Sequence, residues 1–213
     1  MQSVLVIGAG KFGYHLAKNL CDMGNDVMLV DENERKIEEY SSEVTSCEIG
    51  DYTVKANLKA LGVDDYDYVF VCIGDFQDSV VITSYLKELG ARYVISKASS
   101  LVHEKFLIQN GADKVVYPER DMAYTMAVSY NNTIIHDYFK LSDQTGIYEI
   151  EPPYSWIGKS LKKVEVRKAH GVTVIAYKNG DEVKTINSPD YVFKKNEHII
   201  IMGENKNIKK IIR

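Results

Sequence analysis

The sequence has no long hydrophobic run and few cysteines, and it contains none of the common catalytic motifs. No apolar stretch approaches the roughly 20 residues that a membrane-spanning helix needs. The first residues form neither the basic segment nor the long apolar run of a signal peptide. These absences exclude a membrane-spanning protein, and they predict a cytoplasmic location.

The three cysteines, Cys21, Cys47 and Cys72, are widely separated and odd in number. Cys21 and Cys72 fall within apolar helix and strand patterns, which favours reduced core thiols over disulfides or metal ligands. Most histidines also lie far apart, and no pair has the spacing of a known metal site. These scattered residues are His15, His136, His170 and His198.

The charge is distributed unevenly along the chain. Residues 1–146 carry 13 basic and 22 acidic side chains, a net charge of −9, whereas residues 147–213 carry 13 and 8, a net charge of +5. This asymmetry indicates two units with different partners. The basic part has few aromatic side chains that could stack on bases, so nucleic acid is not an expected partner.

The most informative pattern is a short apolar run that leads directly into Gly8, Gly10 and Gly13, with a helix pattern beginning in the same turn. In such a turn Gly8 permits the sharp bend, Gly10 lets the backbone approach phosphates, and Gly13 lets the helix pack close to the strand. The helix N-terminus offers unpaired N–H groups and a positive dipole end to an anion. The pattern predicts a nucleotide site.

An acidic residue follows at the expected distance. Asp31 ends the next strand pattern, 18 residues after Gly13, close to the ~20 of dinucleotide-binding units. Its carboxylate can accept hydrogen bonds from both ribose hydroxyls and would repel a 2′-phosphate, which favours NAD or an adenosine nucleotide over NADP. The alternative is a glycine turn that serves packing alone, with Asp31 capping the next helix. The complete strand–turn–helix–strand–acid pattern favours the nucleotide site.

Strand and helix signals alternate through the first part of the chain, which predicts an α/β fold with a Rossmann-like, doubly wound parallel sheet. Ligands bind beyond the carboxyl ends of such strands, where Gly50-Asp51, Cys72–Gly74 and Lys97 also fall. The predicted strands are Ser3–Gly8, Val27–Val30, Val44–Ile49, Tyr68–Ile73, Tyr93–Ser96 and Lys114–Val116. The predicted helices between them are Lys11–Met23, Glu34–Tyr40, Thr53–Leu61, Gln77–Leu89 and Leu101–Gln109.

Three segments are expected: a nucleotide-binding lobe over 1–130, a connector over 131–146 and a small α+β lobe over 147–213. The first lobe ends with a helix at Arg120–Tyr130. The connector is either a crossover or a short second helix, because its apolar residues have helical spacing. Such a helix pair packs against another subunit or against its own sheet, and the pattern does not decide between them. The apolar residues are Ile134, Ile135, Tyr138 and Phe139.

Taken together, the motifs and their order resemble a known family. Its telling segments here are Val6–Gly13, Val30-Asp31, Ile49–Asp51, Leu61–Val63, Val71–Gly74, Gly111–Glu119, Val166-Arg167, Gly171–Ala176 and Ile200–Gly203. Over its whole length the chain resembles the cytosolic regulatory subunits of Ktr/Trk-type bacterial potassium uptake systems, built from RCK (regulator of potassium conductance) domains.

The resemblance implies a protein that senses nucleotides without being an enzyme. Nucleotide-binding lobes of this family pair into homodimers and assemble into a ring under a membrane potassium channel or transporter subunit, at the inner face of the membrane. ATP and ADP favour different shapes of the ring in some members, and NADH and NAD do so in others. A ligand can do this only by binding two conformations with different affinity.

The resemblance also assigns roles to residues. Gly8, Gly10 and Gly13 would hold the phosphates, Asp31 the ribose, and Asp51 would lie beside the adenosine. ATP-sensing relatives often have arginine in place of Lys11, whose flexible point charge lacks the planar grip of a guanidinium. The choice between ATP/ADP and NAD(H) is therefore left open. The further predicted contacts are Lys11, Phe12, Ile73, Gly74 and Lys97.

Two additional ligands follow from the resemblance. Glu119 matches a glutamate near the dimer interface, where some members bind a divalent cation with ATP; the alternative is capping of the following helix. Some relatives bind cyclic di-AMP between two C-terminal lobes, where this chain has Arg167 and Thr173, with Glu165 and Pro189 nearby. A solvated basic face is the alternative there.

Judged from the residues alone, two other functions compete with the regulatory role. An NAD-dependent oxidoreductase would need a proton donor near the nicotinamide, and the candidates are Lys97 and His103. His103 lies in a predicted helix beside Glu104 and Lys105, which favours a solvated position. A redox-sensing transcriptional regulator would need a helix-turn-helix module, and no such pattern flanks the nucleotide lobe.

Overall fold

The computed structural model describes residues 1–212 and divides into two compact units, Met1–Glu119 and a second unit that begins at Arg120. No helix over the described residues combines the length and the apolar character that crossing a membrane requires. The division lies earlier than the expected limit after residue 130, because helix α6 (Pro118–Tyr130) contributes Val128 to the core of the second unit.

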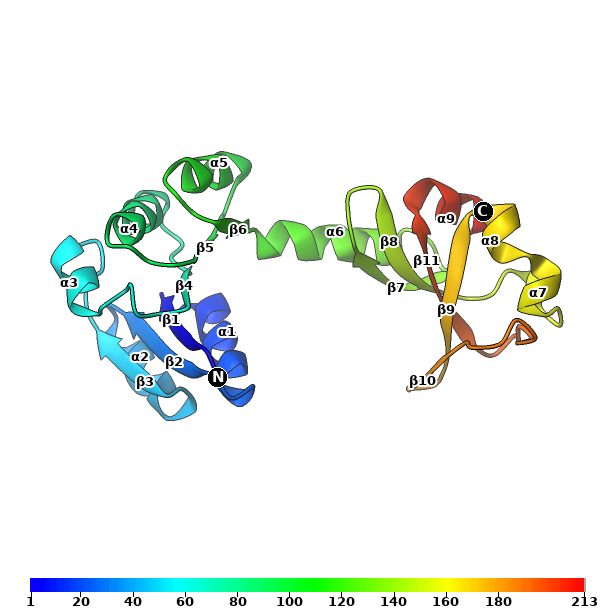
Figure 1. The fold of residues 1–213 in the computed structure, drawn as a ribbon, viewed down its shortest axis with the longest axis horizontal. Helices are drawn as coiled ribbons and strands as arrows, with labels where there is room; N and C mark the ends of the chain where they lie inside the picture. Colours follow the sequence, from blue (N-terminus) through cyan, green and yellow to red (C-terminus); the bar gives the residue numbers. More distant parts are fainter. Residues whose placement is uncertain (213) are drawn as a thin grey trace. The chain divides into compact units, whose positions relative to one another are not determined.

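The first unit contains a six-stranded parallel sheet with the order β3-β2-β1-β4-β5-β6 (Figure 1). This is the strand order of a Rossmann fold, with its switch point between β1 and β4. The predicted doubly wound α/β fold is therefore confirmed. The strands are β1 (Ser3–Ile7), β2 (Asp26–Asp31), β3 (Ser46–Ile49), β4 (Tyr68–Val71), β5 (Val94–Lys97) and β6 (Lys114–Val116).

The helices between these strands differ in how they begin. A side chain accepts a hydrogen bond from the first turn of α2, α4 and α5, whereas α1, which follows Gly10, and α3 have no such cap. The first-turn N–H groups of α1 therefore keep their capacity to bind an anion. The helices are α1 (Lys11–Asp22), α2 (Glu34–Tyr40), α3 (Lys55–Ala60), α4 (Phe76–Glu88) and α5 (Leu101–Gln109), with a short 3₁₀ helix at Ser41–Glu43.

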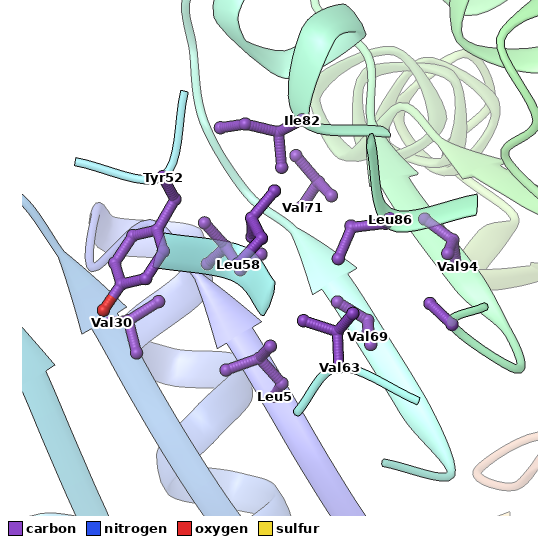
Figure 2. Packing of buried hydrophobic residues seen from close by; sticks show 12 residues of the cluster. Leu5, Val30, Tyr52, Leu58, Val63, Val69, Val71, Ile82, Leu86 and Val94 are labelled. Carbon is purple, nitrogen blue, oxygen red and sulfur yellow. The ribbon is translucent and has the colours of Figure 1, made fainter. Parts of the chain in front are cut away.

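The central strands of the sheet are covered on both faces. Successive residues of β1 alternate between two core clusters: Leu5 packs with α3 and α4, and Val6 packs with α1 and α2. Figure 2 shows the first cluster, in which Val71 of β4 lies against Ile82 of α4 and Tyr52 lies beside Leu58. Full burial explains why these strands read as continuous apolar runs in the sequence.

The second unit contains a five-stranded sheet with the order β10-β9-β11-β8-β7 and antiparallel pairing throughout. Its core includes the fully buried Ile150, Phe193, Ile199 and Ile208. The strands are β7 (Ile135–Lys140), β8 (Thr145–Ile150), β9 (Val172–Asn179), β10 (Glu182–Thr185) and β11 (His198–Glu204). The helices after α6 are α7 (Leu161–Val164), α8 (Val166–His170) and α9 (Asn205–Ile211), with a 3₁₀ turn at Tyr154–Trp156.

Of the two alternatives for residues 131–146, a crossover or a second helix, the helix is wrong, because Ile135–Lys140 is strand β7. The register between β7 and β8 shifts between Ile135 and Asp137, which places a β-bulge at His136. The extra residue puts the buried Ile135 and Tyr138 three positions apart instead of two. A bulged strand thus produces the spacing of a helix.

Candidate functional site

A cavity lies in the first unit at the carboxyl ends of β1 to β4. Six of the predicted ligand contacts line it: Gly8, Gly10, Asp31, Asp51, Ile73 and Gly74. The sheet topology brings them together, since all four strands end at the same edge. The other lining residues are Ile7, Glu32, Lys36, Gly50, Tyr52, Thr53, Cys72, Asp78 and Ile82.

The protein's own packing requires two of the three motif glycines. Gly8 has a φ of +105°, and a Cβ there would lie 3.0 Å from the carbonyl carbon of Cys72. A Cβ at Gly13 would lie 2.0 Å from the carbonyl oxygen of Gly8, because α1 packs directly on the turn. These two glycines therefore shape the turn whether or not a ligand is bound.

Gly10 differs from its two neighbours in the motif. It has an ordinary φ of −70° and extended backbone, and a Cβ added there would meet nothing within 4 Å. Neither conformation nor internal packing calls for glycine at this position. Gly10 lies at the cavity and at the uncapped start of α1, where a missing side chain leaves room for a ligand.

Asp31 holds the glycine turn to β2. It is 8% exposed, and its carboxylate accepts hydrogen bonds from the backbone N–H of Ala9 at 2.7 Å and of Asn33 at 2.9 Å. The Nζ of Lys36 lies 3.0 Å from the same carboxylate. Asp31 thus fixes the turn, and its carboxylate lines the cavity beside the Lys36 ammonium.

The opposite wall comes from the loop after β3. Asp51 accepts hydrogen bonds from the hydroxyl of Thr53 at 2.6 Å and from its backbone N–H at 2.9 Å. These two bonds hold the pKa of Asp51 below its ordinary value. The neighbouring Tyr52 is 3% exposed and joins the core cluster beneath the cavity. The wall therefore presents an ordered, ionised carboxylate above an apolar floor.

Four predicted contacts, Lys11, Phe12, Gly13 and Lys97, lie outside the cavity lining. The Nζ of Lys97 is 5.7 Å from the centre of the Phe12 ring and 2.7 Å from a carboxylate oxygen of Glu119. The hydrogen bond from Lys97 lowers the pKa of Glu119. Over residues 1–212, Glu119 belongs to no group of three side chains placed to share a metal ion.

His103 is not solvated, so the expectation of an exposed position is wrong. Its side chain is fully buried between α4 and α5. The backbone N–H of Ser99 donates to Nδ1 at 3.2 Å, and Nε2 lies 2.7 Å from the hydroxyl of Ser79. Both ring nitrogens are engaged inside the fold, and His103 does not line the cavity.

The predicted second-ligand residues also come together. Arg167 and Thr173 line one cavity of the second unit with Glu165 and Pro189.

In the first unit, Cys72 is buried, and burial raises the pKa of its thiol to about 12. Of the two thiols expected in the core, Cys72 is buried, whereas Cys21 is only partly buried.

Sequence reasoning missed five polar or aromatic residues of the first cavity: Glu32, Lys36, Tyr52, Thr53 and Asp78. The sequence contains signals for some of these residues. Thr53 follows Asp51 by two positions, the spacing of an aspartate that bonds its own backbone two residues ahead. Lys36 and Asp78 lie in the first turns of α2 and α4, which begin just beyond strands of this edge.

Comparisons with known proteins agree with this architecture. The TrkA-N domain model matches residues 4–118, and the TrkA-C domain model matches residues 147–213. Ktr system potassium uptake protein A of Bacillus subtilis (strain 168) is 34% identical over 96% of this chain and 93% of that protein. Ktr system potassium uptake protein C of the same organism is 36% identical over 93% and 90%.

Solved structures show the same fold. The GsuK channel matches with a TM-score of 0.72 and 16% identity; the alignment covers 99% of this chain and 39% of that longer one. The GsuK channel bound to NAD has a TM-score of 0.57 at 19% identity, and GsuK bound to ADP has 0.55 at 17%. From the family models and the Ktr relatives, the chain belongs to the family of Ktr and Trk potassium uptake proteins, with a TrkA-N and a TrkA-C domain.

Proposed function

We propose that this chain is a non-enzymatic regulatory subunit that binds an adenine nucleotide in the cavity of the first unit. Through that binding it opens or closes a potassium channel or transporter subunit in the membrane. The protein works in the cytoplasm and reaches the inner face of the membrane through this partner. The Ktr relatives, which match over almost the whole chain, support the role in potassium transport.

Gly10 carries the nucleotide part of the proposal. Its backbone conformation suits any residue, and the space around its missing side chain is open. Glycine is thus explained by a ligand that approaches the backbone. The uncapped N-terminus of α1, with no acidic residue in its first turn, supplies the N–H groups and dipole end that attract a phosphate. A negatively charged ligand accounts for both features.

The cavity suits the parts of an adenine nucleotide in order. The phosphates would lie against the turn from Gly8 to Gly13, the ribose against Asp31, and the adenosine beside Asp51. Lys36 neutralises part of the charge of Asp31 at 3.0 Å and can contact the ribose or a phosphate. We assign the remaining contacts to Lys11, Phe12, Ile73, Gly74 and Lys97.

The nucleotide is either ATP/ADP or NAD/NADH. Structures of GsuK with NAD and with ADP, which share this fold, support the adenine nucleotide class. Lys11 begins α1 and is exposed, so its flexible ammonium can reach a terminal phosphate without a planar grip. Regulation requires that the two members of a pair bind two protein conformations with different affinity.

Assembly and further ligands complete the proposal. A homodimer that builds a higher ring would transmit the change of shape to the membrane subunit. Helix α6 presents exposed apolar side chains at Met122, Met126 and Tyr130, four positions apart on one face, which suits pairing with a second copy.

We place a divalent cation at Glu119 when ATP is bound, and cyclic di-AMP at Arg167 and Thr173.

The alternative function is that of an NAD-dependent oxidoreductase. The side chain best suited to proton transfer in the first unit is His103, and its ring nitrogens are engaged with Ser79 and Ser99 inside the fold. This engagement favours a structural role. Regulation without chemistry on the ligand therefore fits the observed contacts better than hydride transfer.

Calorimetry of the intact protein with ATP, ADP, NAD and NADH tests the first step. We expect saturable binding of at least one pair, and loss of binding in Gly10→Asp, which places a charged side chain against the phosphates. Gly146→Asp is unsuitable as a control because a Cβ there meets Tyr138 at 2.4 Å. Asn19→Asp, at an exposed position of α1 outside the cavity lining, adds the same charge and should bind normally.

Potassium flux in vesicles that contain the membrane subunit tests the second step. Addition of the regulatory chain should make the flux depend on which nucleotide of the pair is present. A flux that ignores nucleotide, although calorimetry detects binding, would refute the regulatory role. Steady turnover of NADH with a small substrate would instead establish the oxidoreductase.

A further inference from the structure

Three side chains of the second unit gather on neighbouring strands, far along the sequence from one another. His136 lies on β7, Glu151 directly follows β8, and His198 begins β11. One potential metal-ligating atom from each lies within 4.8 Å of the other two. The two imidazole rings stack with their centres 3.8 Å apart and their planes 18° from parallel. The antiparallel pairing of β7, β8 and β11 creates this cluster.

The β-bulge on β7 is part of the cluster. The register with β8 shifts at His136, and bulges often redirect a side chain next to a functional site. The three side chains are accessible: His136 is 35% exposed, Glu151 57% and His198 34%. An ion from solution can therefore reach all three without any opening of the fold.

The separation of two donors suits a shared ion. The Nε2 of His136 lies 3.4 Å from a carboxylate oxygen of Glu151. Two ligands at about 2.0–2.1 Å from one tetrahedral zinc ion stand about 3.3–3.4 Å apart. The third donor, on His198, lies within 4.8 Å of both. The pair is thus already spaced as one edge of a zinc tetrahedron.

His198 is held by a second glutamate. Its Nδ1–H donates to Glu149 at 2.7 Å, which leaves the lone pair of Nε2 for an ion. Glu149 is fixed in turn by the ammonium of Lys178 at 2.9 Å. A carboxylate behind a ligating histidine is the usual outer partner in metal sites.

We propose that His136, Glu151 and His198 bind a divalent transition-metal ion of the zinc class, with a water molecule in the fourth position. Two imidazoles and one carboxylate suit Zn²⁺, whereas Mg²⁺ and Ca²⁺ prefer oxygen ligands throughout. The ion would connect the edge strand β7 to β11 across β8. It is a second ligand of the protein, independent of the nucleotide proposed for the first unit.

Titration of the intact chain, prepared without a histidine tag, with Zn²⁺ alone tests the proposal by calorimetry. We expect one ion per chain, and a visible absorption band of tetrahedral cobalt when Co²⁺ replaces Zn²⁺. His136→Gln and His198→Gln should abolish both signals. Glu149→Gln, which removes the outer partner, should weaken zinc binding by about 10- to 100-fold.

Two matched variants make the test specific. His170→Gln removes a histidine of the same unit that packs on Trp156 and should leave zinc binding unchanged. Glu119→Gln should also leave it unchanged, which separates this site from a cation at the nucleotide lobe. Circular dichroism of each variant checks its fold. Absence of saturable binding by the folded parent chain, or unchanged binding in folded His136→Gln and His198→Gln, would overturn the proposal.

Discussion

Gly10 and Gly13 stand three residues apart in one turn, and their surroundings differ. Gly13 touches the protein itself, since its Cβ would lie 2.0 Å from the carbonyl oxygen of Gly8. A Cβ added at Gly10 would meet nothing within 4 Å. A glycine motif read from sequence treats both as ligand residues, and only the packing around each separates a folding requirement from a binding requirement.

Alanine at each position should therefore give opposite results. Gly10→Ala should change the free energy of unfolding by less than about 1 kcal/mol, the size of a helix-cap effect, and weaken nucleotide binding at least tenfold. Gly13→Ala should destabilise the fold by about 3 kcal/mol or more, because α1 must move off the turn. Urea unfolding and calorimetry measure the two effects. Normal nucleotide affinity in Gly10→Ala would contradict the assignment of the cavity.

A second residue-scale prediction concerns the charge of Asp31. Asp31→Asn keeps a carbonyl oxygen for the N–H of Ala9, which donates at 2.7 Å, but removes the negative charge that repels a 2′-phosphate. The ratio of NADP to NAD affinity should rise by about tenfold, the effect of roughly 1.4 kcal/mol. Competition binding measures this ratio. Asp51→Asn, on the opposite wall, is the control and should leave the ratio unchanged.

Among the elements, regular strands were predictable and the bulged one was not. Strands β1, β2 and β4 are buried on both faces, so the sequence shows each as an apolar run. Strand β7 carries the bulge at His136, which gives its buried residues helical spacing. For the candidate site, glycine and acid positions were visible in sequence. The cluster of His136 and His198 was hidden, because strand pairing creates it between residues that are far apart in the chain.

Because His103 is buried between α4 and α5, we expect the free energy of unfolding to depend on pH. Burial lowers the pKa of His103 in the folded state, so the unfolded chain binds a proton more tightly. Stability should then fall as the pH drops below about 6.5, by at most about 1.4 kcal/mol per pH unit. His103→Gln should flatten this dependence between pH 5 and 7. Urea unfolding across that range measures it.

The matched control is His15→Gln on the exposed surface of α1, which should keep the parent slope. The same slope in His103→Gln as in the parent chain would show that other groups cause the acid sensitivity. A loss of stability in His103→Gln at every pH, without a change of slope, would equally contradict the role assigned to burial.

At the scale of the whole molecule, α6 leaves apolar surface exposed. Met122 is 60% exposed, Met126 52% and Tyr130 83%. Single exposed apolar residues are common, but a row on one helical face indicates an interaction surface. This row is the part of the second unit best suited to hold two copies together, as the proposed homodimer requires.

A charge in the middle of that row should separate the copies. Met126→Glu is expected to lower the molar mass measured by light scattering at micromolar concentration, because a carboxylate in an apolar contact stays unpaired. Met23→Glu is the control, since Met23 is 78% exposed at the end of α1. If Met126→Glu still forms dimers, the contact between the two copies lies on another surface.

The bond between Asp31 and Ala9 also bears on how this protein can diverge. One carboxylate both fastens the turn and lines the cavity in which we propose that the nucleotide binds. A small residue at position 31 would admit a 2′-phosphate and, in the same step, release the turn that positions Gly10. Ligand preference and foldability are therefore tied at this residue. Lys36 and Glu32 also border the cavity without holding the turn, so they offer descendants of this chain a freer route to a new nucleotide.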